Sequence, residues 1–102
     1  MRRGDPVLTS IRNKSVIVTG GTKGIGKGIA GVFATLGAQV CVIGRNEHDG
    51  AATVEALRRG GGTAIFCRGD VKELGDMEEA AATVAAAFGG VDILCANAAL
   101  EG

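Results

Sequence analysis

The residues best suited to chemistry are the glycines of the stretch TGGTKGIGKGIAG, residues 19–31. Glycine-rich turns at the start of a helix bind phosphate, because backbone N–H groups and the positive helix end converge there. Several spacings compete for this role, and each implies a different ligand and chemistry. They are G-x-G-x-x-G over 26–31, G-x-x-x-x-G-K over 21–27, and G-x-x-x-G-x-G from Gly20 through Gly24 to Gly26.

The elements around this stretch alternate between short apolar runs and segments with helical spacing. Apolar runs rich in β-branched residues and bounded by glycine indicate buried strands, whereas apolar repeats at i, i+4 and i+7 indicate helices. We predict strands at 15–19, 38–43, 63–68 and 91–96, and helices at 24–36, 47–59 and 72–88. The β-α-β-α-β-α-β order favours a doubly wound parallel α/β sheet with right-handed crossovers and helices on both faces.

The first predicted helix carries apolar residues on one face, which we expect to pack on the sheet. They are Ile25, Ile29, Val32, Phe33 and Leu36. Gly28 and Gly31 fall inside this helix, where each costs about 1 kcal/mol relative to alanine. We therefore expect these two glycines to allow close helix–sheet packing and not to bind phosphate, which disfavours the G-x-G-x-x-G spacing.

The position of each spacing relative to the strand separates the remaining two. The triphosphate-binding pattern needs Ser or Thr to coordinate Mg²⁺ after its lysine, and Gly28 stands there, although Asp70 could supply a second magnesium ligand. Gly20, in contrast, follows the strand directly, while Gly24 and Gly26 fall at the helix start. We predict that these three glycines adopt unusual φ values and let the backbone approach a pyrophosphate.

The stretch TGGTKGIG (19–26) resembles the T-G-x-x-x-G-I-G motif of the short-chain dehydrogenase/reductase family. The resemblance implies a Rossmann-like fold that binds a nicotinamide dinucleotide, and it covers roughly residues 11–100, the first half of such proteins. With GRN (44–46) and DILCANA (92–98), the set is most similar to 3-oxoacyl-acyl-carrier-protein reductases and their general-purpose relatives. It also implies cofactor contacts for Thr22, Ile25 and Asn46.

The residues after the second predicted strand favour NADP(H) over NAD(H). An acidic residue at this position binds the ribose 2′-hydroxyl of NAD, whereas a basic one accommodates the 2′-phosphate of NADP. Gly44 lacks the acid, Arg45 supplies a positive charge, and Lys23 in the glycine turn could supply a second. An ordinary solvated loop arginine is the alternative for Arg45.

Two further motifs gain a role only through the resemblance. The family's Asp-Val pair contacts the adenine, which implies this role for Asp70 and Val71, although Asp70 could also cap the helix predicted at 72–88. The family's Asn-Ala pair lies beside the nicotinamide ribose, which implies this role for Asn97 and Ala98. Ala99 stands where the family has glycine, so its Cβ could crowd the cofactor.

The family mechanism needs residues that this sequence lacks. By resemblance, hydride transfer between nicotinamide and a carbonyl or alcohol uses a Ser, a Tyr and a Lys that follow the fifth strand. The chain has no tyrosine, so we expect no catalytic residue here and no competence for catalysis alone. The alternative is a non-catalytic half-Rossmann module that pairs with a partner chain. Full-length relatives are expected to be homo-oligomeric, and this piece could need a partner or aggregate through its fourth strand.

Composition excludes several other classes of function. The chain has 102 residues and a formal net charge of zero, so neither a nucleic-acid footprint nor an anionic membrane partner is indicated. No apolar run is long enough to span a bilayer, and we expect a cytoplasmic protein. Residues 1–14 read as a polar leader before the half-domain of 15–102. The three separate cysteines predict buried free thiols and no metal site.

Overall fold

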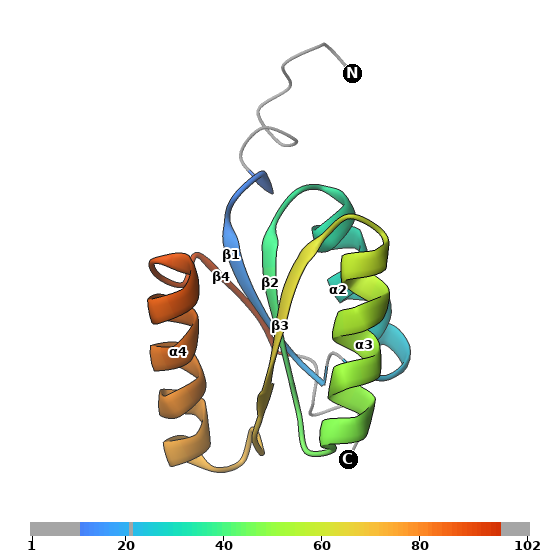
Figure 1. Cartoon of the computed structure of the whole chain (residues 1–102). Coiled ribbons are helices and arrows are strands. Elements are labelled where there is room, and N and C mark those ends of the chain that lie inside the picture. The colour runs from blue at the N-terminus through green and yellow to red at the C-terminus, as the bar shows by residue number, and fades with distance from the viewer. Residues whose placement is uncertain (1–10, 21, 97–102) are drawn as a thin grey trace.

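The computed structural model describes residues 11–20 and 22–96, which form a sheet with helices on both of its faces. All strand pairs are parallel, and the strand order is β3-β2-β1-β4 (Figure 1). This architecture confirms the predicted doubly wound sheet. The elements are β1 (Ser15–Thr19), α2 (Gly24–Thr35), β2 (Gln39–Gly44), α3 (Glu47–Arg59), β3 (Thr63–Arg68), α4 (Leu74–Phe88) and β4 (Ile93–Ala96).

The sheet is apolar on both faces because helices cover both (Figure 1). Val16 and Val18 of β1 pack toward α2 and α3, whereas Ile17, between them, packs toward α4. All five residues of β1 are buried, as expected for a central strand of a parallel sheet. The register joins Val16 to Val40, so the valines of β1 and β2 share one apolar layer.

Small residues hold α2 against the sheet, which corrects the predicted helix face. The buried residues of α2 are Gly26, Ala30 and Ala34, spaced four apart. Ile25 and Val32, expected to face inward, are 68% and 60% exposed. A helix turns about 100° per residue, so Ile25, next to Gly26, points well away from the sheet. Ile29 and Phe33, which belong to the same predicted face, do pack against the core, so the predicted face is correct in part.

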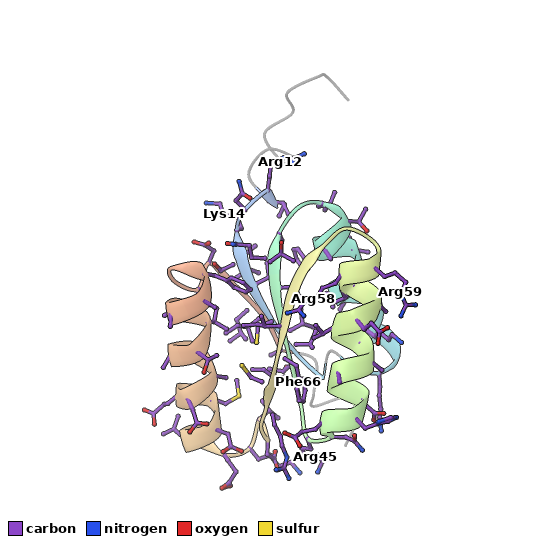
Figure 2. All side chains as sticks on the ribbon, in the orientation of Figure 1. Arg12, Lys14, Arg45, Arg58, Arg59 and Phe66 are labelled. Atoms are coloured by element: carbon purple, nitrogen blue, oxygen red, sulfur yellow. The ribbon has the colours of Figure 1, made fainter. Side chains whose placement is uncertain are left out.

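The close helix–sheet packing expected at Gly28 and Gly31 is not found in the structure. A Cβ added to Gly28 or Gly31 would meet no atom within 4 Å, so neither glycine is needed for contact with the sheet. Close packing occurs instead at Gly50 of α3, where an added Cβ would lie 2.4 Å from Cδ1 of Phe66. Figure 2 shows the Phe66 ring between β3 and α3. No sequence pattern around Gly50 or Phe66 predicts this contact.

β1, α3 and β3 have the predicted boundaries, and the other elements differ from the prediction by one or two residues. β4 begins at Ile93, and Asp92 before it accepts a hydrogen bond from the Ser15 backbone N–H through its Oδ2, at 2.9 Å. Residues 1–10 of the predicted leader lie outside the described part of the chain. Backbone hydrogen bonds from Asn13 N to Gly37 O (2.9 Å) and from Gln39 N to Lys14 O (2.8 Å) attach the end of this predicted leader to the start of β2. No helix in the described residues is long and apolar enough to cross a membrane.

The packing at Gly50 gives a test of the fold. Gly50→Ala should lower the free energy of unfolding by about 1–3 kcal/mol, because the new methyl group overlaps the Phe66 ring. Gly28→Ala is the matched control in another helix, and it should raise stability by up to about 1 kcal/mol because nothing opposes the methyl group. Urea denaturation measures both changes. Equal effects of the two substitutions would contradict this packing.

Candidate functional site

A hollow of about 540 Å³ lies at the carboxyl ends of β1, β2 and β3. Because these strands are parallel, the loops that follow them meet at one edge of the sheet, where ligands bind in open α/β folds. The volume falls within the range of roughly 300–1,000 Å³ that is usual for small-molecule sites. The lining residues are Thr19, Gly20, Thr22, Lys23, Ile43, Gly44, Arg45, Asn46, Asp49, Gly69, Asp70, Val71 and Lys72.

The turn after β1 forms one wall of this hollow. Gly20 has a φ of 65° and Gly24 a φ of 50°, so both occupy the left-handed region that favours glycine. This confirms the unusual φ values predicted at these two positions, whereas the prediction is wrong at Gly26, which is buried inside α2 and has no positive φ. The Gly20 backbone N–H donates to the oxygen of Ile43 at 2.9 Å, which fixes the turn to the end of β2.

Gly44 lets the turn pass close to β2. An added Cβ at this residue would lie 3.2 Å from Oγ1 and 3.3 Å from Cγ2 of Thr22. A larger residue would therefore push against the Thr22 side chain. The absence of a side chain at Gly44 also leaves the end of β2 without a carboxylate, and the next side chain that lines the hollow is that of Arg45.

The first turn of α2 is left without a capping side chain. Its N-cap residue, Lys23, makes no side-chain capping bond, and the turn contains no acidic residue. The first turns of α3 and α4 both contain acidic residues, including Asp49 in α3 and Asp76 in α4. The positive end of α2 therefore favours an anion that the helix itself does not provide.

Charged side chains surround the hollow. Nζ of Lys23 lies 3.8 Å from Oδ2 of Asp49, across the space between the glycine turn and α3. Arg45 and Lys72 add positive charge from the loops after β2 and β3. Figure 2 shows Arg45 at the same end of the sheet, opposite the end that carries Arg12 and Lys14.

Two aspartates fix the loop after β3, and Asp70 does not have the helix-capping role that was its alternative. Asp70 does not cap α4, because the helix begins at Leu74 with Glu73 as its N-cap. Oδ1 of Asp70 instead accepts from the Lys72 backbone N–H at 2.9 Å. Oδ2 of Asp76 accepts from the Asp70 backbone N–H at the same distance. The carboxylates thereby shape the loop that closes one side of the hollow.

Comparison with known proteins places this geometry in a family. Residues 14–102 match the family described as short chain dehydrogenase. The chain belongs to this family. The match begins just before β1 and includes the whole described site.

Proteins of this family with similar sequences include reductases that are named for different substrates. The chain is 40% identical over 87 residues to the 3-oxoacyl-[acyl-carrier-protein] reductase FabG of Chlamydia pneumoniae, covering 85% of this chain and 35% of that protein. A crystal structure of a variant actinorhodin polyketide ketoreductase with NADPH is 34% identical, with a TM-score of 0.80, over 82% of this chain and 32% of that one. The chain thus spans about a third of these relatives.

A third relative differs in length. The short-chain dehydrogenase/reductase homolog YusS of Bacillus subtilis is 35% identical over 92 residues. The match covers 89% of this chain and 84% of YusS. A family member of nearly this length therefore exists beside the much longer ones.

The site residues predicted from the family motifs fall into three groups in the structure. Seven of them line the hollow: Gly20, Thr22, Lys23, Arg45, Asn46, Asp70 and Val71. Gly24, Ile25 and Gly26 form the first turn of α2 but do not line it. Asn97 and Ala98, with the neighbouring Ala99, lie outside the described residues.

Charged residues of the hollow that carry no family motif were missed. Asp49 and Lys72 line it, and Arg68 lies beside it in a second, adjoining hollow. Their positions follow from parallel strand ends and from the first turn of α3, so an inspection of every charge near a predicted strand end could have found them. The spacing of residues in the motifs did not indicate these three charges.

The three cysteines are free thiols outside this hollow. Burial raises the pKa of Cys41 strongly, and the neighbouring Cys67, whose Sγ lies 3.4 Å away, raises it further. Burial also raises the pKa of Cys95. Cys41 is fully buried, as predicted, while Cys67 and Cys95 are half-buried. Thiols whose pKa is raised remain protonated and are poor nucleophiles.

The Asn46 cap provides a test of how the site is held. Oδ1 of Asn46 accepts from the Asp49 backbone N–H at 3.0 Å, which fixes the start of α3 directly after Arg45. Asn46→Ala should lower the free energy of unfolding by about 1 kcal/mol, measured by urea denaturation. Asn46→Asp retains an acceptor and serves as the control. An alanine variant as stable as the aspartate variant would show that the cap contributes nothing.

Proposed function

We propose that this hollow binds the adenosine half of NADP(H) within an oxidoreductase of the short-chain dehydrogenase type. The observation that carries the proposal is the position of Arg45. It follows β2 directly and lines the hollow, while Gly44 before it offers no carboxylate to a ribose 2′-hydroxyl. A basic residue without the acid accommodates a 2′-phosphate.

The glycine turn supports the pyrophosphate part of the proposal. Gly20 and Gly24 carry the positive φ values that such a turn needs, and the first turn of α2 lacks both a capping side chain and an acidic residue. Backbone N–H groups at this helix start would bind the phosphates, and Lys23 would add a positive charge. Asp70 and Val71 would lie at the adenine, on the other wall of the hollow.

The chemistry proposed for the whole protein is hydride transfer between a nicotinamide and a carbonyl or alcohol. Bound NADP(H) would supply or accept the hydride. Reduction of a 3-oxoacyl thioester is the more specific proposal, and it rests on similarity to FabG of Chlamydia pneumoniae. The described residues would bind and orient the cofactor, whereas the Tyr of the family mechanism does not occur in this sequence. Three other expectations remain predictions. They are the division into a leader and a half-domain, the cytoplasmic location and the homo-oligomeric state of full-length relatives.

A second candidate function is a non-catalytic half-Rossmann module that pairs with another chain. Among the described strands β4 lies at the edge of the sheet, and its Leu94 is 57% exposed. Light scattering after size exclusion separates the two: a stable monodisperse monomer that binds NADPH argues against a missing partner chain.

Calorimetric titration with NADPH and with NADH tests the proposed cofactor. We expect NADPH to bind about tenfold or more tightly than NADH, because a charge-assisted hydrogen bond is worth roughly 1.5–3 kcal/mol. Arg45→Asp should remove this preference, since it replaces the positive charge with the acid typical of NAD sites. Absence of binding by either nucleotide would refute the cofactor proposal, and unchanged selectivity in the variant would refute the role of Arg45.

The ion pair between Lys23 and Asp49 gives a second test. Asp49 holds a negative charge beside the expected phosphates, so Asp49→Asn should tighten NADPH binding by roughly two- to fivefold. Glu55→Gln is the matched control, because it breaks an exposed pair with Arg59 elsewhere on α3. Isothermal titration at low and high salt measures the effect, which should shrink as salt rises. Weaker binding by the asparagine variant would contradict the assignment of this space to phosphates.

A further inference from the structure

Arg68 is the last residue of β3 and lies beside the proposed cofactor site, although it belongs to no recognised motif. It pairs in register with Gly44, so it stands at the strand end next to the one that Arg45 follows. Its Nε donates a hydrogen bond to the backbone oxygen of Arg45, at 3.3 Å. This bond connects the ends of two adjacent strands.

The two arginines share a second hollow of about 330 Å³. This hollow adjoins the first, because Arg45, Gly69 and Asp70 line both. Its lining brings a guanidinium from the loop after β2 and another from the end of β3 to one place. Such an arrangement suits an anion that can accept several hydrogen bonds, because each guanidinium presents a planar fork of donors.

The charges in this second hollow are not balanced against one another. Within residues 11–20 and 22–96, neither Arg45 nor Arg68 has a carboxylate oxygen within 4.0 Å. The carboxylates of Asp70 and Asp76 already accept backbone N–H groups, from Lys72 and Asp70 respectively. The aspartates therefore shape the loop, while the two guanidinium groups remain available to a ligand.

We propose that Arg68 is a second determinant of cofactor choice, which binds the 2′-phosphate together with Arg45 and positions Arg45 through its backbone oxygen. The inference rests on the proposed function and deepens it, because it assigns the selectivity for NADP to a pair of arginines and not to Arg45 alone. The 2′-phosphate is the group that distinguishes NADP from NAD, and it offers three oxygens to the two donor forks.

Titration with 2′,5′-ADP and with 5′-AMP tests the inference on the full chain, because these ligands differ only in the 2′-phosphate. Arg68→Met should raise the Kd for 2′,5′-ADP by roughly five- to tenfold, the loss expected for one charged contact, and change that for AMP by less than about twofold. Equal weakening of both ligands would show contact with the adenosine and overturn the inference, as would no change in either.

Arg58→Met is the matched control. Nε of Arg58 donates to the oxygen of Ala64 at 3.0 Å, so this variant loses the same charge and the same kind of bond to a strand-associated carbonyl, away from both hollows. We expect Arg58→Met to leave the preference for 2′,5′-ADP over 5′-AMP unchanged. If Arg58→Met raised the Kd for 2′,5′-ADP as much as Arg68→Met does, the effect would arise from loss of charge in general, and the inference would be overturned.

Combining Arg45→Met with Arg68→Met tests the positioning role. If Arg68 holds Arg45 in place, the fold-increase in the Kd for 2′,5′-ADP in the double variant should be smaller than the product of the fold-increases in the two single variants. A loss equal to that product would contradict positioning. If the unmodified chain binds neither ligand, the proposed function fails and this inference with it; if it binds 2′,5′-ADP selectively and Arg68→Met leaves the selectivity intact, only this inference fails.

Discussion

The parallel pairing of β1 with β2 and of β2 with β3 is the constraint on which the site depends. Parallel strands place their carboxyl ends at one edge, so the turn at Gly20, the loop at Arg45 and the loop at Asp70 come together. The bond from Gly20 N to Ile43 O fixes this meeting point by fastening the first turn to the end of β2. An antiparallel arrangement would send neighbouring loops to opposite edges.

Small side chains make this pairing compatible with covering helices. Gly26, Ala30 and Ala34 let α2 lie close to the sheet, and Gly50 does the same for α3 against Phe66. The sheet supplies valines to this contact, and Ile29 and Phe33 of α2 and Leu57 of α3 pack against them from the edges of the helices' buried faces. The start of α2 is thereby held near the end of β1, and its N-cap residue, Lys23, lines the hollow.

The sequence predicted the elements well because alternation and periodicity follow directly from backbone geometry. Its account of α2 was wrong in detail, since apolar spacing does not distinguish a face that packs through Ala30 from one that exposes Val32. Gly28 and Gly50 show the same limit, because a glycine's need for space depends on what lies across the contact.

The candidate site was predictable where a motif carried it and not where tertiary placement did. Lys23 and Arg45 followed from their positions beside a glycine turn and a strand end. Asp49 and Arg68 belong to no motif, and although a survey of charges near strand ends could have found them, their proximity to Lys23 and Arg45 depends on the turn into α3 and on the register of β3 with β2. The charge distribution around the ligand therefore emerges only when the strands are assembled.

The most direct test of the account is a map of backbone amide shifts in the ¹⁵N-labelled chain during titration with NADPH. The account predicts that the largest shifts occur at the carboxyl edge, around Thr22, Arg45 and Val71, and that the opposite edge around Arg12 and Lys14 stays unchanged. Shifts concentrated at Arg12 and Lys14, or no saturable shifts at all, would contradict it.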